Sequence, residues 1–246
     1  MRHFHKNTQA PAILRQHSQA ETQRLINAAN GGNISLLITD LYKHPDVKMQ
    51  LKNDQNGKCA YCERYYNGDY GAVEHYRPKG EVQQREGAQV EKPGYYWLAY
   101  EWENLLFSCS ECNTSWKRSL FPLMDPSERN IANRDISREQ SLLINPSIED
   151  PADFIGFRRE YAVPRIVNGQ PSQKGQITID VLGLNKRADL KQRRFEAYHE
   201  YKMLLKIRAI LKYGGLTLGV ALIDNYIDRR TNDYAEFTGM FHNQLP

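Results

Sequence analysis

The sequence has no run of apolar residues that approaches the roughly 20 needed to cross a lipid bilayer. Its first residues, MRHFHKNTQAPAILRQ, include basic side chains, but no apolar segment follows them as it would in a secretory signal. Internal repeats and low-complexity tracts are absent too. We therefore expect no association with a membrane, and the expected compartment is the cytoplasm.

Cysteine is scarce as well, and the four cysteines of the 246-residue chain all stand in C-x-x-C pairs. A reducing cytoplasm disfavours structural disulfides, so thiolate ligands of a metal are expected instead. Two C-x-x-C turns together complete the sulfur tetrahedron that Zn²⁺ prefers, which leaves no open position and makes the zinc structural. A redox pair and unrelated buried cysteines are the alternatives. The predicted ligands are Cys59, Cys62, Cys109 and Cys112.

The spacing of apolar residues predicts helices at the start of the chain. One helix is expected over 12–30, where Gly31-Gly32 would stop it, and a second over 45–56. Short strand-like pieces such as GAVEHY follow, with a polar loop at 80–92. The fold class is therefore α+β.

The texture of the sequence changes again after Asp125, where an irregular stretch rich in Asn, Asp and Pro begins. The segment FRREYAVPRIVNGQ predicts a hairpin that turns at Asn168-Gly169. Helices dominate beyond it. The chain is long enough for one domain with additions or two small domains, and three regions are expected: a helical region at 1–56, a core at 57–125 and a mainly helical region at 126–246.

A long basic helix is predicted over 186–212. Its three acidic residues are outnumbered by nine Lys and Arg side chains, at 186, 187, 191, 193, 194, 202, 206, 208 and 212. The simplest interpretation is a solvated helix face. A face that follows phosphates or docks a partner is the alternative.

A second group of polar residues lies between and beside the cysteine pairs. It consists of Glu74 and His75 at the end of a predicted strand, Asn104, and Asn113 directly after the last cysteine. Each residue alone is unremarkable, but together they fit hydrolysis of a phosphodiester. That reaction needs a base for water, a divalent cation at the phosphate and a group that offsets the charge of the transition state. Carboxylate and amide oxygens suit Mg²⁺ or Mn²⁺, and histidine supplies a near-neutral base.

The order C-x-x-C, Glu-His-x-x-Pro, Asn, C-x-x-C-Asn resembles the HNH endonucleases, whose ββα-metal core is two strands and a helix around one catalytic metal. More narrowly, the chain is similar to the PtuB-like HNH nucleases of Septu-type anti-phage systems, over about residues 45–195. The likeness is carried by KCAYCE (58–63), VEHYRPKG (73–80), YYWLAYEWENLLFSCSECN (95–113), FPL (121–123) and the later LLINPSIEDP and ITIDVLGLN.

This resemblance implies roles for individual residues. His75 would be the general base and Glu74 a ligand of a catalytic Mg²⁺ or Mn²⁺. Asn104 would hold the loop that aims the base, and Asn113 would be the second metal ligand. Asparagine in place of a third histidine, and glutamate where many relatives have aspartate, leave that metal less tightly specified. The candidate phosphate contacts are Arg77, Lys79 and Lys117, with ordinary surface charges as the alternative.

The resemblance also implies partners. An ABC-type or SMC-type ATPase (PtuA-like) would be encoded alongside, the substrate would be nucleic acid with DNA favoured over RNA, and similar nucleases accompany some retrons. The net charge of only +4 agrees, because a protein that grips duplex alone usually carries a stronger basic excess. No helix-turn-helix signature or second zinc finger supports a restriction or homing enzyme acting alone.

Two matters stay open. The chain is either a metal-dependent nuclease or a zinc-stapled adaptor whose HNH-like site is degenerate and which mainly binds the ATPase. In the segment YYWLAYEW, the aromatic residues suit either a packed core or stacking on nucleobases. For the adaptor question, the deciding observation is whether the side chains of Glu74, His75 and Asn113 converge.

Overall fold

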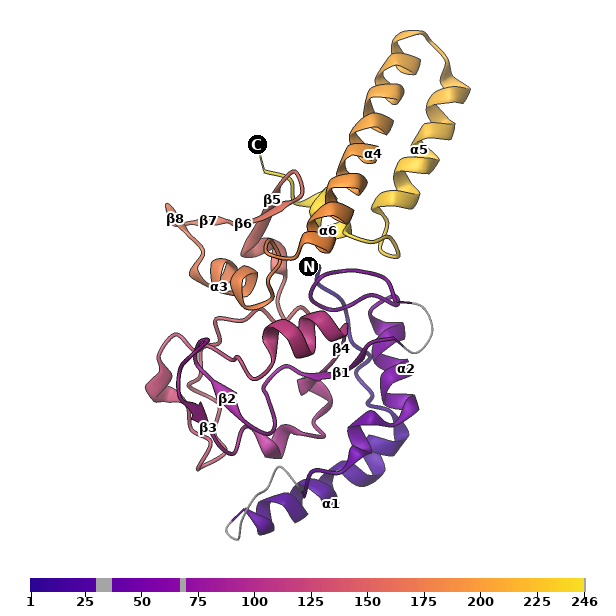
Figure 1. Ribbon diagram of the computed structural model, residues 1–246. Coiled ribbons are helices and arrows are strands. Elements are labelled where there is room, and N and C mark those ends of the chain that lie inside the picture. The colour runs from indigo at the N-terminus through magenta and orange to yellow at the C-terminus, as the bar shows by residue number, and fades with distance from the viewer. Residues whose placement is uncertain (30–36, 67–69, 246) are drawn as a thin grey trace.

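The computed structural model describes residues 1–29, 37–66 and 70–245 (Figure 1). Near the start of the chain it contains α1 (Ala12–Ala28) and α2 (Pro45–Asp54), close to the two helices predicted there. Proline at the first position of α2 suits a helix start, where its missing N–H costs nothing. The predicted stop at Gly31-Gly32 lies outside the described residues.

The centre of the molecule is a strand pair followed by a helix. Strand β1 (Ala72–His75) pairs antiparallel with β4 (Leu105–Ser108), so that Glu74 lies opposite Leu106. All four residues of β4 are buried, and α2 packs against both strands. A π-helical segment, η5 (Glu111–Lys117), follows β4 directly. Strand, strand and helical segment thus lie together at the centre of the molecule.

The long connection between β1 and β4 is folded rather than open. It contains the small pair β2 (Val82–Gln83) and β3 (Val90–Glu91), inside the segment expected to be a loop, and the turns η3 (Tyr96–Leu98) and η4 (Trp102–Asn104). The aromatic side chains of this connection are at most 8 % exposed, which confirms the core interpretation over stacking on nucleobases: Tyr95, Tyr96, Trp97, Tyr100 and Trp102.

Two further hairpins follow. Strand β5 (Ile155–Arg158) pairs with β6 (Tyr161–Pro164), and β7 (Ile166–Val167) pairs with β8 (Gln170–Pro171). The second hairpin turns at Asn168-Gly169, as predicted, and both residues have positive φ, at 52° and 77°. Two-residue hairpin turns of this kind favour Asn-Gly because both positions require the left-handed region.

Helices make up the end of the chain. After α3 (Gln173–Val181), the long α4 (Ala188–Tyr213) and α5 (Thr217–Thr231) form an antiparallel pair that projects from the body (Figure 1), and α6 (Thr238–His242) returns to it. The long basic helix is confirmed within two residues at its start and one at its end. Within the described residues no helix combines the length and apolarity needed to cross a membrane.

Candidate metal centre and active-site cleft

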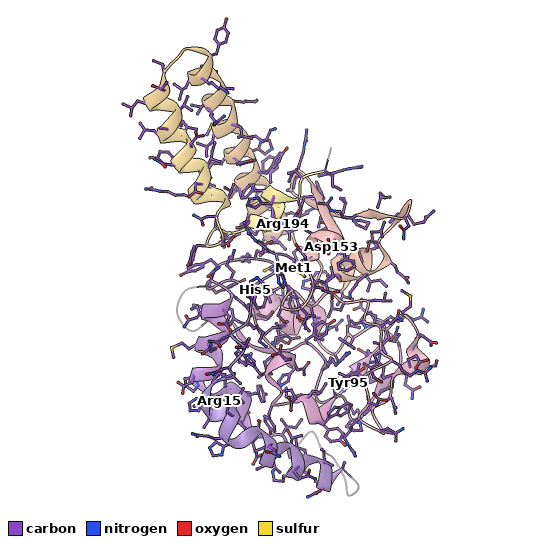
Figure 2. All side chains as sticks on the ribbon, turned by 180° about the vertical axis from the view of Figure 1, so that it is seen from behind. Met1, His5, Arg15, Tyr95, Asp153 and Arg194 are labelled. Atoms are coloured by element: carbon purple, nitrogen blue, oxygen red, sulfur yellow. The ribbon has the colours of Figure 1, made fainter. Side chains whose placement is uncertain are left out.

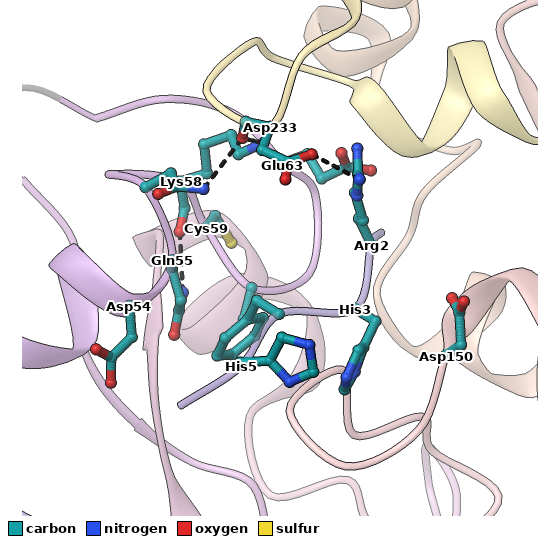
Figure 3. A pocket seen from close by; sticks show the side chains of 13 residues that line it. Arg2, His3, His5, Asp54, Gln55, Lys58, Cys59, Glu63, Asp150 and Asp233 are labelled. Atoms are coloured by element: carbon teal, nitrogen blue, oxygen red, sulfur yellow. Dashed lines mark hydrogen bonds and ion pairs between the residues drawn. The ribbon is translucent and has the colours of Figure 1, made fainter. Parts of the chain in front are cut away.

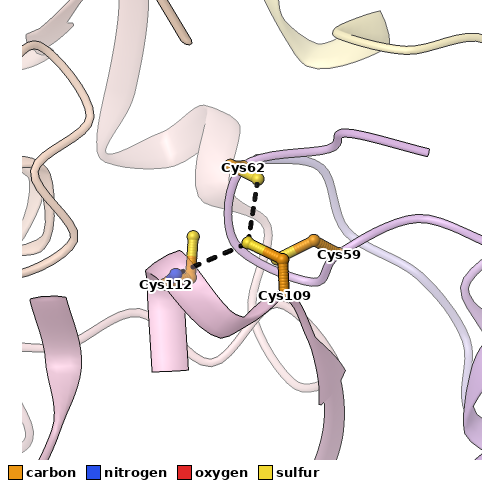
Figure 4. Close-up of side chains that lie close together, drawn as sticks. All are labelled: Cys59, Cys62, Cys109 and Cys112. Atoms are coloured by element: carbon orange, nitrogen blue, oxygen red, sulfur yellow. Dashed lines mark hydrogen bonds between the residues drawn. The ribbon is translucent and has the colours of Figure 1, made fainter. Parts of the chain in front are cut away.

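The four cysteines form one buried cluster. Cys59 and Cys62 come from the loop after α2, while Cys109 and Cys112 lie where β4 runs into η5 (Figure 4). Their sulfur atoms all lie within 4.8 Å of one another, and the Cys62 and Cys109 sulfurs are 3.8 Å apart. A zinc tetrahedron with bonds of about 2.3 Å has edges of about 3.8 Å. The cluster therefore fits a closed, structural zinc site.

A buried arginine lies against this cluster. The Arg187 Nη1 atom donates to the Cys112 sulfur at 3.1 Å, and the residue is only 5 % exposed. Four thiolates around one Zn²⁺ carry two excess negative charges, so the guanidinium offsets half of that charge. The contact ties the first residues of the C-terminal helix pair to the centre of the molecule.

The basic helix face predicted over 186–212 needs correction for this reason. Arg187 and Arg194 are not on the surface, since Arg194 is 1 % exposed and its Nη1 atom donates to the Leu184 carbonyl at 2.9 Å. Figure 2 shows Arg194 at the base of the projecting pair. A periodic pattern shows which residues share a helix face, but it does not show that thiolates lie beneath that face.

A cleft of about 540 Å³ opens beside β1. Three of the four predicted catalytic residues line it together: Glu74 and His75 from β1, and Asn113 from η5. Tyr42 and Lys79 line it as well. The structure therefore brings Glu74, His75 and Asn113 to the wall of one cleft.

His75 is held in one orientation. Its Nε2 atom lies 2.9 Å from the Ala99 carbonyl, which can only accept, so Nε2 carries the proton and Nδ1 keeps a free lone pair. The ring also meets the edge of Tyr42, with centroids 4.6 Å apart. Burial first, and then the charge of Lys79, lowers the pKa of His75 well below its ordinary value. The imidazole is thus neutral at pH 7, with its Nδ1 atom unprotonated.

Asn104 lies behind the cleft, where it fastens the loop that follows β1. Its Oδ1 atom accepts from the Arg77 amide at 2.8 Å, and its Nδ2 atom donates to the carbonyls of Arg77 and Leu98 at 3.1 and 3.0 Å. The loop on one side follows His75, and the loop on the other side leads to Ala99, the acceptor for His75. Asn104 therefore links the loop that follows His75 to the loop that carries its acceptor.

Glu74 has a partner that the sequence did not indicate. The Lys117 Nζ atom lies 2.6 Å from its Oε1 atom and donates to the His75 carbonyl at 3.0 Å, and both side chains are buried. Burial raises the pKa of Glu74, while Lys117 acts in the opposite direction. Lys117 is therefore an internal counter-charge, and the phosphate contact predicted for it has no support in this geometry.

The other two predicted phosphate contacts, Arg77 and Lys79, lie in different places. The Arg77 Nη1 atom lies 3.2 Å from Oε2 of Glu139, whose side chain is fully buried, and the guanidinium packs over Phe121. Arg77 thus belongs to a structural ion pair outside the cleft. Lys79 lines the cleft, with its ammonium 4.6 Å from the centre of the Tyr42 ring, and burial lowers its pKa. Of the three candidates, only Lys79 lines the cleft.

A second cavity, of about 400 Å³, lies beside the first cysteine pair (Figure 3). His3 and His5 from the first residues of the chain line it, with Cys59 and Asp233. The Lys58 Nζ atom closes one side by donating to the Asp233 carbonyl at 2.6 Å. This cavity contains none of the predicted catalytic residues.

Comparison with known proteins extends this description. The structure combines a buried four-cysteine cluster that fits a zinc ion with a cleft lined by a neutral histidine. No protein-family model matches the chain. The chain is 40 % identical over 156 residues to the Septu protein PtuB of Bacillus mycoides (strain KBAB4), a match that covers 63 % of this chain and 52 % of that protein. A Septu protein PtuB of Bacillus thuringiensis is 26 % identical over 182 residues, which cover 73 % of this chain and 53 % of that protein. The chain is therefore PtuB-like over the matched part, and it spans about half the length of these relatives.

A third relative has a different name. The Septu protein PtuA of Bacillus mycoides (strain KBAB4) is 31 % identical over 156 residues. The match again covers 63 % of this chain, but only 21 % of that protein. A segment similar to this chain thus occurs inside a much longer polypeptide.

Proposed function

We propose that this chain is a metal-dependent nuclease of the HNH type, which acts in anti-phage defence of the Septu kind together with a PtuA-like ATPase. The observation that carries the proposal is that Glu74, His75 and Asn113 line one cleft, with the histidine neutral and its Nδ1 atom unprotonated. PtuB-like identity over the matched residues supports the assignment to defence.

The chemical step proposed for His75 is removal of a proton from water. Its Nε2 proton is held by the Ala99 carbonyl at 2.9 Å, which leaves Nδ1 as the basic atom. Asn104 acts on the same step indirectly, because its hydrogen bonds to Arg77 and Leu98 fix the loops on either side of the histidine. Lys79, which lines the cleft, would contact the phosphate from its wall.

Glu74 and Asn113 are the residues that would hold a catalytic Mg²⁺ or Mn²⁺. Their carboxylate and amide oxygens are suitable donors, and within the described part of the chain the Asn113 side chain makes no hydrogen bond that would compete. Such an ion would supply Lewis-acid stabilisation of the scissile phosphate and the leaving oxygen. Two protein ligands are few, so substrate phosphate and water would fill most of the coordination positions.

The adaptor remains a second candidate because of one contact. The Lys117 ammonium, 2.6 Å from Glu74 Oε1, already offsets the carboxylate charge that a metal would use. With Lys117 paired to Glu74, the cleft would have only a structural role, and the function of the chain would be to bind its partner.

The association with PtuA is supported by the third relative. About a fifth of a protein named PtuA is similar to this chain, which supports an association of this chain with a PtuA-like protein. Nucleic acid is the proposed substrate, with DNA favoured over RNA.

The experiment that tests the proposal is a cleavage assay on the chain assembled with its PtuA-like ATPase. Plasmid DNA, linear DNA and RNA are each incubated with Mg²⁺, with Mn²⁺ or with neither, and with or without ATP. We expect cleavage that requires the added metal and is lost in Asn113→Ala. The control is Ser115→Ala, at an exposed residue of η5 outside the lining of the cleft. Equal cleavage by both variants would remove the metal role of Asn113, and an assembled complex that never cuts would favour the adaptor.

A further inference from the structure

The outer part of the α4–α5 pair has no core of its own. We call residues 195–231 the arm. The buried residues of α4 are Leu190 and Arg194, both before the arm begins, and α5 has none. In Figure 1 the arm extends away from the rest of the molecule. Helices of this length owe most of their stability to an apolar face packed against something else. Beyond Tyr201, which packs on Phe241, the two helices have mainly each other.

Helix α4 shows a second apolar face to solvent. Phe195, Met203, Ile210 and Tyr213 are 42 %, 54 %, 70 % and 98 % exposed. A rotation of about 100° per residue places them in one stripe along the helix. The half-buried residues that meet α5, such as Leu211, fall on the opposite side.

Helix α5 repeats this arrangement. Leu218, Leu222 and Tyr226 follow each other at intervals of four residues and are 76 %, 55 % and 57 % exposed. Val220 and Ile227 are half-buried on the side that faces α4. Each helix therefore packs one apolar side against its neighbour and leaves another uncovered. Exposed apolar side chains that recur along one side of each helix point to contact with another molecule.

The charges of the arm indicate what covers it. Two ion pairs clasp the helices together, Arg208 with Asp224 at 2.5 Å and Arg230 with Glu200 at 2.6 Å. Beyond these pairs, the arm carries four basic side chains and two acidic ones that form no ion pair in the described part of the chain: Lys202, Lys206, Lys212 and Arg229, against Glu196 and Asp228.

The excess of basic side chains and the exposed apolar residues distinguish between three possible binding partners of the arm. A second copy of the chain would bring the lysines of α4 against the same lysines, which like-charge repulsion disfavours. Nucleic acid would match the positive charge but not the two apolar stripes. A protein groove with an apolar floor and an acidic rim matches both features.

We propose that the arm is the docking element for the PtuA-like ATPase, which receives it in an apolar groove with an acidic rim. This inference rests on the partner named in the proposed function. The arm supplies no residue to the cleft, and α4 begins beside Arg187, whose contact with Cys112 leads to η5 and Asn113. The docking element and the cleft are thus separate in sequence and joined through the zinc-type cluster.

The test is a binding titration of purified PtuA-like ATPase against variants of the full chain. Ile210→Asp combined with Leu222→Asp should weaken binding at least 100-fold, because both side chains are more than half exposed and their loss leaves the fold intact. The matched control is Met49→Asp, a methionine of α2 that is 58 % exposed. Reversal of Lys202, Lys206 and Lys212 to Glu should weaken binding about 10-fold at low salt and less at high salt.

The outcomes distinguish this inference from the proposed function. If the wild-type chain binds the ATPase and the arm variants bind equally well, the docking inference is overturned while the nuclease proposal stands. If the arm variants lose only self-association or only DNA binding, a second copy or nucleic acid is the occupant and the inference is also overturned. If the arm variants lose ATPase binding while Asn113→Ala keeps it, the docking inference is supported even if no nuclease activity is found.

Discussion

Replacement of Arg187 by methionine tests whether the C-terminal helices are anchored on a metal cluster. The guanidinium lies 3.1 Å from the Cys112 sulfur in a buried site. Two opposite charges about 4 Å apart interact by about 4 kcal/mol at an effective dielectric constant of 20. Release of the cost of burying the guanidinium reduces the net effect. We therefore expect Arg187→Met to lower the free energy of unfolding by about 3 kcal/mol, within the range for a broken buried pair.

Two measurements check this expectation. Urea unfolding gives the change in the free energy of unfolding. The rate at which a colorimetric chelator takes up zinc gives the rate of zinc release from the cysteine cluster. The control is Arg193→Met, because Arg193 is 52 % exposed and reaches Glu236 only at 3.9 Å. Zinc release and stability that are the same in Arg187→Met and Arg193→Met would refute the anchoring role.

Three more predictions follow from single contacts. Cys112→Ser should lose bound zinc and cooperative folding together, as seen by metal analysis and thermal melting, because metal binding is part of the folding free energy. Asn104→Ala should cost about 2 kcal/mol in denaturant unfolding, since three half-buried backbone groups lose their partner. Gly183→Ala should cost about 3 kcal/mol, because its φ is +57° and a Cβ atom there would lie 2.3 Å from the Trp116 ring. Gly87→Ala, with φ +75° and nothing within 4 Å, should cost only about 1 kcal/mol by the same measurement.

The features that the sequence predicted well are local ones. Each C-x-x-C pair fixes two sulfurs within one turn, so the composition of the cluster could be inferred without the fold. Asn168-Gly169 likewise selects its hairpin turn through backbone conformation alone. The helices over 12–28 and 188–213 followed from apolar spacing.

The features that the sequence did not predict depend on distant partners. Lys117 looks like a surface lysine near the cysteines until β1 brings Glu74 to within 2.6 Å of it. Arg187 and Arg194 look like members of a basic helix face until the cysteine cluster lies beneath them. Tyr42, which positions His75, belongs to a segment that carries no motif. Burial of a charge is decided by tertiary contacts, which a periodic pattern does not contain.

The most direct measurement of the central claim is the single-turnover rate of DNA cleavage by the chain assembled with its ATPase in Mg²⁺. His75→Ala should slow cleavage at least about 100-fold, because it removes the base that accepts the proton of water. Zinc content and assembly should be unchanged, and His44→Ala, at a histidine that is 41 % exposed, should cut at the wild-type rate. Cleavage by His75→Ala at the wild-type rate would contradict the assignment of this cleft as the nuclease site.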